Sequence, residues 1–597
     1  MIRAGAVFCG RILLAGGLLL AFAVSGAPLR EISTSGGGRI RTLDPAYADD
    51  LASRNLICAV YDTLLEYDYD ARPYRLKPSM LKRMPEPENG FRSYRFELRD
   101  DLYFAADPVF GGRKRKITSR DVLFSFLRLA DARNHSPLYW LFRGRIVGLD
   151  AFHARTAACA RGDLRPYDGG LAGFRILSDT KFVIDLAGPD PRFLYALAMP
   201  NAAVVAREAV EFYGESFARH PVGSGPFLLK RWISDCRIEL ERNPAFRKEF
   251  YPGAASAADR SRPLPLADRI VIKLVKQSMT AWMLFLQGNL DCQTLDKDNS
   301  DLAGGGELPE VLRKRGIRLQ RVPEFEIRYI GFNFGDPRFA GNEKLRQALS
   351  LAFSAARRIE HSGNQLLPAD GPIPPGVAGF DENLRNPWMR HDVEKAKKLL
   401  AEAGFPGGRD PATGRPLKLT FDQTGHTSAH RQFGEITAAE FAELGIKLEV
   451  VLNNNPRFYE KLRGGKMELF RLSWIGDYPD AENFLQLFYS GNAGGCNRTG
   501  FSDPAFDRMF EEILPMPDSP ERTAKYRRMA EYIARKCVWI YEGFPVSYQL
   551  AHAWLENHTP HDFGFARWKY LSVDTALRDK LKRSFTPVKL SELAGKP

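Results

Sequence analysis

The sequence predicts an α/β fold with mixed sheets, divided among several domains. Short strands and amphipathic helices alternate along most of the chain. Two strands flank a helix near residues 430–444, and this strand–helix–strand order is typical of α/β folds. With 597 residues, the chain exceeds what one hydrophobic core usually holds, so we expect several domains or lobes.

The first half of the chain contains four clear elements. Residues 94–104 alternate apolar and polar side chains, which predicts a half-buried strand. Residues 118–131 carry apolar side chains at helical spacing, with Ser119 as a capping residue. Residues 181–189 read as a strand ending in a turn, and 220–232 as a Gly/Pro turn leading into a strand.

The second half continues the same alternation. Residues 327–334 form a predicted strand, and residues 342–361 a single long amphipathic helix. A further helix is predicted for 392–405, with Gly404 near its C-terminal end. The proline-rich residues 366–380 are predicted to form a stiff surface connection.

The amino-terminal residues have the pattern of a secretory signal peptide. Arg3 and Arg11 precede the apolar run that begins at Ile12 and ends in small residues at Ala27. We therefore predict cleavage after residues 1–27 and a periplasmic or other extracytoplasmic location. Cys9 lies before the apolar run, so we do not expect a lipoprotein.

Charge and cysteine usage exclude several functions. The net charge is +13, but 85 basic residues are scattered among 72 acidic ones, and the basic run Gly111–Lys116 reads as a solvated loop. We therefore expect no nucleic-acid partner. Six cysteines follow the predicted signal peptide, an even number that permits disulfides or buried thiols equally. They include no C-x-x-C pair, so no metal or cofactor site is predicted.

The sequence shows no recognisable catalytic motif. The chain contains no G-x-S-x-G, no H-E-x-x-H and no G-x-x-x-x-G-K-[ST]. We therefore do not predict an enzyme, and a secreted hydrolase is kept only as an alternative.

One stretch, "SWIGDYPDAENFLQLF" from Ser473 to Phe488, places three acids in an apolar and aromatic setting. By composition alone, Asp477 reads as a turn residue before Tyr478 and Pro479. Asp480 and Glu482 read as residues that cap the start of the following helix.

A series of stretches, taken in order, resembles the family 5 extracellular solute-binding proteins, which serve ABC importers of oligopeptides and dipeptides. The resemblance extends from about Thr42 to about Ser547. The stretches are "TLDPAYADDLASRNLICAVYDTLLEYD", "YRFELRDDLYF", "TSRDVLFSFLRL", "HPVGSGPFLLKRW", "YIGFNFGDPRFAGNEKLRQALSLAF", "DVEKAKKLLAEAGF" and "SWIGDYPDAENFLQLF".

The resemblance implies a two-lobe periplasmic-binding-protein fold of type II (Venus flytrap), with a hinge and an extra inserted domain. It places domain I at 28–61, 179–326 and 544–597, domain II at 62–178 and domain III at 327–543. It implies a monomer that captures peptides between its lobes and delivers them to membrane-embedded ABC permease subunits. The alternative with the same fold is a non-peptide solute such as a metal complex, haem or a sugar.

The resemblance also implies binding residues in domain III. Asp477 matches the residue that takes the ligand's α-ammonium, and the backbone of Ser473, Trp474 and Ile475 matches the strand that pairs with the peptide. Tyr478 is expected to line a pocket or to belong to the core.

Two weaker correspondences complete the predicted site. Asp49, Asp50 and Leu51 match a segment of domain I that borders the peptide, although solvated acids are an equal alternative. Arg431 matches a helix position that meets the ligand's carboxylate in dipeptide-binding relatives, and an ordinary surface arginine is the alternative.

Overall fold

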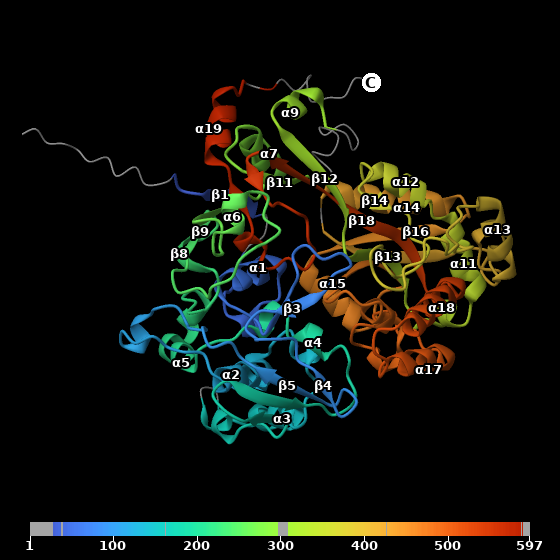
Figure 1. Ribbon diagram of the computed structural model, residues 1–597. Coiled ribbons are helices and arrows are strands. Elements are labelled where there is room, and N and C mark those ends of the chain that lie inside the picture. Colours follow the sequence, from blue (N-terminus) through green and yellow to red (C-terminus); the bar gives the residue numbers. More distant parts are fainter. Residues whose placement is uncertain are drawn as a thin grey trace, which may run out of the picture.

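The computed structural model describes residues 28–36, 40–160, 163–295, 308–425, 427–586 and 588 (Figure 1). The predicted signal peptide, residues 1–27, therefore lies outside the described residues. Helices α10–α18 and strands β13–β17, coloured yellow to orange, form one part of the molecule, which we call the second lobe. The remaining segments, blue and green together with the red C-terminal end, form the first lobe. The predicted α/β fold with mixed sheets is confirmed.

One hydrogen-bonded sheet runs through both lobes. Among the described residues it holds twelve strands, with the main order β16-β15-β17-β13-β18-β11-β1-β10-β9-β8 and with β12 and β14 also paired to β18. Pairs such as β15–β16 and β1–β10 are parallel, whereas β13–β17 and β12–β18 are antiparallel. The strands are β1 (Glu31–Gly36), β8 (Phe227–Ile233), β9 (Arg237–Arg242), β10 (Arg269–Leu274), β11 (Cys292–Leu295), β12 (Ile317–Pro323), β13 (Glu326–Phe332), β14 (Leu366–Leu367), β15 (Lys418–Thr424), β16 (Lys447–Asn453), β17 (Leu469–Ile475) and β18 (Trp539–His552).

Strand β18 connects the lobes. Figure 1 shows it, in dark red, running from the side of β11 in the first lobe to the side of β13 in the second. Its early residues pair with β13 and its later residues with β12. The chain crosses between the lobes a second time, from β12 to β13. This crossing is hydrogen-bonded to β18, because the Glu324 N–H donates to the Pro545 carbonyl at 2.8 Å. The two crossings therefore lie side by side, as a hinge between lobes requires.

A separate sheet in the first lobe has the order β4-β5-β7-β6. Stacked rings of Phe96, Phe182 and Phe174 occupy its core, with centroids 4.9 and 4.8 Å apart. The predicted domain boundary at residue 178 falls between β6 and β7, two strands of this one sheet. The sheet thus extends to Asp185, and the division into three domains stays a prediction. Its strands are β4 (Pro87–Glu88), β5 (Ser93–Glu97), β6 (Phe174–Ile176) and β7 (Lys181–Asp185).

Short hairpins and helices complete the two lobes. The hairpin strands are β2 (Leu65–Tyr67), β3 (Leu76–Pro78), β19 (Leu555–Glu556) and β20 (Ser572–Val573). The helices of the first lobe are α1 (Leu51–Val60), α2 (Ser119–Ala130), α3 (Leu149–Ala157), α4 (Phe193–Ala196), α5 (Arg207–Tyr213), α6 (Ala257–Arg260), α7 (Ser278–Leu286), α9 (Glu310–Lys314) and α19 (Thr575–Arg583). Those of the second lobe are α10 (Pro337–Ala340), α11 (Glu343–Ala352), α12 (Ala355–His361), α13 (Val393–Glu402), α14 (Ser428–Ala442), α15 (Asn455–Arg463), α16 (Glu482–Leu485), α17 (Pro504–Ile513) and α18 (Pro520–Lys536).

Most elements match their predictions, and the differences have local causes. Helix α2 is confirmed, but its cap is Thr118, which forms a capping box with Asp121. The helix predicted for 342–361 is wrong, because the backbone is extended at Phe353 and Ser354 caps a new helix, α12. The strand predicted for 94–104 ends at Glu97.

The proline-rich connection is also different from its prediction. Ile373 and Val377 are buried, and Leu366 and Leu367 pair with β18. The segment packs into the second lobe because its apolar side chains find partners there, which composition alone did not reveal. The six cysteines outside residues 1–27 are free thiols, so the possible disulfides are not formed.

Candidate ligand-binding site

Strand β17, which was predicted to pair with a ligand, has a free edge along its second half. Its whole length pairs with β13, but on the other edge only Leu469 and Phe470 pair with β15. Among the described residues, no strand pairs with Arg471–Ile475 on that edge. An extended chain can therefore add there as a further strand through main-chain hydrogen bonds.

A cavity of about 460 Å³ opens where β15 and β17 separate. Gln423 and Thr424 at the end of β15 and Arg471, Leu472 and Ser473 of β17 line it, together with residues of β13, α12, α14 and β18. Its volume lies in the range of small-molecule sites, which is about 300–1,000 Å³. The free edge of β17 thus borders a space large enough for part of a ligand.

Three arginines that line this cavity are each held by a carboxylate. The pairs are Arg471 with Glu542 (2.6 Å), Arg328 with Glu326 (2.9 Å) and Arg358 with Glu440 (2.7 Å). The cavity therefore presents fixed polar groups, and a ligand carboxylate would compete with Glu542 for Arg471. The sequence reasoning missed Arg471, although it lies two residues before Ser473 and therefore on the same face of the strand.

Asp477 lies after β17, where the two lobes meet. The preceding Gly476 donates its N–H to the Phe325 carbonyl at 2.8 Å, and a Cβ at this position would lie 2.1 Å from the Phe325 ring. The Asp477 N–H donates to Asn483 Oδ1 at 3.1 Å, which fixes the turn. Burial raises the pKa of Asp477 to about 6, and the charge of Arg54 and the side chain of Asn483 oppose this only in part.

Two side chains of the first lobe interact electrostatically with Asp477, and sequence reasoning did not find them. Arg54 lies on α1, and Asp477 exerts the strongest attraction on its guanidinium, ahead of Asp49 and Asp50. Tyr67 ends β2, and burial, followed by the charges of Tyr195 and Asp477, raises its pKa. Within the described residues, neither Arg54 Nε nor the Tyr67 hydroxyl has a hydrogen-bond partner, although both atoms are buried.

The other predicted residues of β17 are divided between its two faces. Ser473 is exposed, and Ile475 has 61% of its surface exposed, which is unusual for this residue type. Trp474 points to the opposite face and donates Nε1–H to Asn483 Oδ1 at 2.9 Å. Asn483 therefore supports both Trp474 and the Asp477 backbone from one side-chain oxygen.

Tyr478 is a contact between the lobes. Its ring stacks on Tyr195 of the first lobe with centroids 5.6 Å apart, and its hydroxyl donates to Glu482 at 2.5 Å. Arg192 of the first lobe lies 3.5 Å from Glu482 and donates to the Leu514 carbonyl at 2.8 Å. The stretch that contains Asp477 is thus held against the first lobe.

The two remaining acids of this stretch have structural partners. Asp480 accepts the Glu482 N–H at 2.9 Å near the start of α16, as a capping residue does. It also accepts from Arg522 at 2.8 Å and from the Tyr526 hydroxyl at 2.6 Å, all of them buried. Asp480 therefore joins α16 to α18 and is not directed at a ligand.

The predicted residues of the first lobe border Arg54. Asp49 is exposed and pairs with Arg41 at 3.0 Å, and Leu51 is 57% exposed. Asp50 caps α1 by accepting the Ser53 N–H at 2.8 Å. Their predicted contact with a ligand stays a prediction.

Arg431 lies at the exposed surface of α14. Its neighbours His430 and Phe433 line the 460 Å³ cavity, whereas Arg431 is not among the lining residues. Its predicted role towards a ligand carboxylate likewise stays a prediction.

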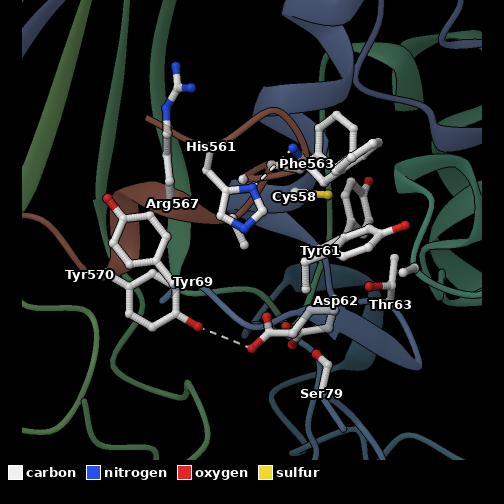
Figure 2. Close-up of a pocket in the computed structure, with 16 residues that line it drawn as sticks. Cys58, Tyr61, Asp62, Thr63, Tyr69, Ser79, His561, Phe563, Arg567 and Tyr570 are labelled. Atoms are coloured by element: carbon white, nitrogen blue, oxygen red, sulfur yellow. Dashed lines mark hydrogen bonds between the residues drawn. The ribbon is translucent and has the colours of Figure 1, made fainter. Parts of the chain in front are cut away.

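A much smaller cavity lies within the first lobe (Figure 2). Its volume of about 30 Å³ is room for roughly one water molecule, too little for a solute. Figure 2 shows Tyr69, Tyr570 and His561 around it, with Asp62 and Ser79 below. This cavity belongs to the packing of the C-terminal segment on the first lobe and not to the ligand site.

Buried charges beside this cavity balance one another. Lys569 Nζ lies 2.9 Å from Glu66 and 3.1 Å from Glu249, and Arg247 lies 2.6 Å from Asp62. Although burial alone would raise it, the charges of Lys569, Lys77 and Arg247 hold the pKa of Glu66 well below its ordinary range. The cluster joins the segment around residue 569 to strands near the start of the chain.

The described ranges offer neither a metal site nor a helix able to span a membrane. They contain no group of three or more His, Cys, Asp or Glu side chains suited to a metal ion. No helix within them is long and apolar enough to cross a membrane.

Comparison with protein families gives one match. Residues 75–496 match the model of the bacterial extracellular solute-binding proteins, family 5 Middle. These residues include β17, Asp477 and the lining of the cavity on β15 and α14.

The individual proteins that this chain resembles match it over most of their length, but at low sequence identity. The periplasmic oligopeptide-binding protein OppA of Salmonella typhimurium is 24% identical over 550 residues, covering 90% of this chain and 91% of that protein. Heme-binding protein A of Haemophilus influenzae is 25% identical over 525 residues, covering 86% and 87%. The structure of the periplasmic binding protein DppA from Helicobacter pylori, in complex with the peptide STSA, has a TM-score of 0.71 at 20% identity and covers 91% and 98%. The similarity of structure confirms the predicted two-lobe type II fold.

Proposed function

This chain belongs to the family 5 bacterial extracellular solute-binding proteins, and from this premise we propose that it binds peptides between its lobes and delivers them to an ABC importer. The observation that carries the proposal is the free edge of Arg471–Ile475 on β17, beside a cavity and next to Asp477. A free strand edge offers main-chain hydrogen bonds to an extended peptide whatever its side chains are. OppA, a relative over nine-tenths of the chain, is named for oligopeptide binding.

Within this proposal, Asp477 is the anchor of the ligand's α-ammonium. A carboxylate that is partly removed from water gains a charge-assisted hydrogen bond of about 1.5–3 kcal/mol from an ammonium group. The backbone of Ser473–Ile475 forms the ladder, and Asp49–Leu51 border the bound chain. The cavity lined by Arg471 and Ser473 receives a side chain or the following residues of the peptide.

Peptide binding is tested directly with the purified mature protein. We expect native mass spectrometry of protein incubated with a peptide mixture to show one intact peptide bound per chain, and calorimetry to give saturable binding. Failure to bind peptides of any length would refute the proposal. Cleavage of the peptide by homogeneous protein would favour the alternative of a secreted hydrolase.

Peptide affinity is expected to fall in mild acid. Only the ionised Asp477 carboxylate attracts an ammonium, and its pKa is about 6 in the absence of ligand. Since the peptide's amino group stays protonated below pH 7, affinity should weaken about tenfold between pH 7 and pH 5. Calorimetric titrations of the free peptide at these two pH values measure the change in affinity. The same titrations with an amino-terminally acetylated peptide are the control. That peptide lacks the ammonium, so its affinity should change little.

The location and partners follow from the same proposal. A signal peptide at residues 1–27 exports the chain, which then acts outside the cytoplasm as a monomer beside membrane-embedded permease subunits. Detection of the amino-terminal sequence of secreted protein, by Edman or mass-spectrometric analysis, tests cleavage near Ala27.

A second candidate function keeps the fold and changes the solute. Heme-binding protein A, a relative that covers 86% of this chain, is named for haem. A haem titration followed by absorbance separates the two candidates, because a haem protein would bind haem tightly and ignore peptides.

A further inference from the structure

One arginine of the first lobe reaches the end of a helix in the second lobe. Arg192 directly precedes α4, and its guanidinium donates to the Ile513 carbonyl at 3.3 Å and to the Leu514 carbonyl at 2.8 Å. Ile513 is the last residue of α17, and Leu514 is its C-cap. Carbonyl groups at a helix C-terminus lack partners within the helix and carry the negative end of its dipole. Arg192 therefore caps a helix of the opposite lobe.

The same guanidinium meets a carboxylate of the second lobe. Arg192 Nε lies 3.5 Å from Glu482 of α16, and each of these side chains is less than one-tenth exposed. The Tyr478 hydroxyl holds Glu482 in place by donating to it at 2.5 Å. On the first lobe, Tyr195 of α4 stacks on the Tyr478 ring. Arg192 and Tyr195 thus contact one and the same stretch of the second lobe.

The first lobe fixes the backbone of Arg192 and leaves its side chain to the second lobe. The Arg192 N–H donates to Asp190 at 3.1 Å, and Asp190 is paired with Arg145 at 2.6 Å. The next residue, Phe193, is fully buried and lies against the Tyr94 ring with centroids 5.8 Å apart. Among the described residues, the hydrogen bonds and the ion pair of the Arg192 guanidinium go to the second lobe. These bonds form only when the lobes are together.

The Arg192 contacts lie away from the hinge and from the proposed ligand site. Figure 1 shows α4 and α17 below the strands β12 and β18, which cross between the lobes. Rotation about a hinge displaces distant points most, so opening the lobes separates Arg192 from α17. Arg192 lines a cavity of about 400 Å³ formed by both lobes, and it is not among the residues that line the 460 Å³ cavity beside β17. Its effect on a ligand is therefore exerted through closure.

We propose that Arg192 is a closure latch, which caps α17 and pairs with Glu482 and thereby slows the release of any ligand held between the lobes. The inference rests on the proposed function for the kind of ligand, whereas the closure that it describes does not depend on that ligand. A residue that shifts only the closing equilibrium changes the affinity of every enclosed ligand by the same factor.

Replacement of Arg192 by methionine tests the latch on the full mature chain. Arg192→Met removes the donors and the charge, and we expect the Kd of a peptide to rise about tenfold, as for the loss of a charge-assisted hydrogen bond. The amino-terminally free and acetylated forms of that peptide should lose affinity equally. Surface plasmon resonance should assign the loss to faster dissociation, because a peptide enters while the lobes are open. Arg192→Lys keeps the cation and should lose less.

A second arginine provides a matched control inside one lobe. Arg346 of α11 is buried and donates to the carbonyls of Lys536 at 3.0 Å and Cys537 at 3.1 Å, which are the last residue and the C-cap of α18. It caps a helix as Arg192 does, but the donor and the helix belong to the same lobe. Arg346→Met should therefore lower the thermal unfolding midpoint without changing the peptide's dissociation rate.

The carboxylate partner gives an independent variant. Glu482→Gln removes the charge that faces Arg192 and keeps an oxygen for the Tyr478 hydroxyl. It should speed dissociation of the free and acetylated peptides alike. In the double variant, Arg192→Met should add less than it does in the wild type, because the two residues act through one contact. Glu482→Gln takes the place of Arg192→Met if the latter does not fold.

The outcomes separate the latch from the proposed function. An unchanged dissociation rate for Arg192→Met, or a loss that differs between the free and acetylated peptides, overturns the latch and leaves peptide binding intact. If the wild type binds no peptide, the proposed function fails and small-angle X-ray scattering decides the latch. Arg192→Met should have a larger radius of gyration than the wild type, and equal radii would overturn the inference.

Discussion

Replacement of Asp477 by alanine is expected to weaken the binding of peptides with a free amino terminus by about ten- to a hundredfold. The change removes the only carboxylate that the proposed function assigns to the α-ammonium, and one charge-assisted hydrogen bond is worth about 1.5–3 kcal/mol. The loss should be larger than for replacement of Ser473 or Ile475, since these two residues are proposed to contribute through the backbone. Calorimetric titration of the wild type and of Asp477→Ala with one peptide measures this loss of affinity.

The same peptide with an acetylated amino terminus is the decisive control. It has no ammonium, so Asp477→Ala should change its affinity little. Asp100→Ala removes a carboxylate that is 69% exposed at a surface pair with Lys82, and should change neither affinity. Equal losses for the free and acetylated peptides would show that Asp477 supports the fold of the turn and not the ligand.

Replacement of Lys569 by methionine is expected to destabilise the protein by about 3–5 kcal/mol. The Lys569 side chain is 1% exposed and holds both Glu66 and Glu249, so its removal takes the most buried cation from a buried and a half-buried carboxylate. Breaking a buried ion pair from one side costs this much where the remaining charge is unpaired. Lys77, 3.1 Å from Glu66, and Arg247, 3.0 Å from Glu249, stay in place, so we expect the lower end of this range. Urea unfolding followed by circular dichroism measures the change in free energy.

The pH dependence of this destabilisation provides a second test. The pKa of Glu66 is held well below its ordinary range in the folded state, so its stabilising contribution is present above the unfolded value and is lost as pH falls towards the folded value. The difference between wild type and Lys569→Met should therefore narrow below about pH 4. Lys82→Met, at a surface pair with Glu97, is the control and should leave the unfolding midpoint unchanged. An unchanged midpoint for Lys569→Met as well would show that the cluster is not a source of stability.

Local sequence patterns predicted most single elements. Helix α13 and the unit β15–α14–β16 follow from apolar spacing, because a helix or strand must bury one face whatever its neighbours are. The break between α11 and α12 was not predictable from spacing, since the apolar pattern continues through Phe353. The extended backbone there depends on burial of the Phe353 ring and on the cap at Ser354.

The free edge of β17 shows which feature of a β-sheet the sequence alone does not predict. The sequence predicts a strand at Ser473–Ile475, but not which of its edges is paired. That depends on where β15 diverges, after pairing with Leu469 and Phe470. Hydrogen bonds between strands join residues far apart in the chain, and a strand's own composition does not record them.

By itself, the sequence determined the order of most elements, and its resemblance to a known family implied the two-lobe fold and the place of Asp477 directly after a strand. Only the tertiary structure decided which charges face one another. Arg54 is far from Asp477 in the chain, and Glu542 is far from Arg471, yet each pair interacts in space. The reason is physical: a carboxylate's pKa and its affinity for a cation depend on distances and on burial by other segments, which exist only after the lobes have folded together.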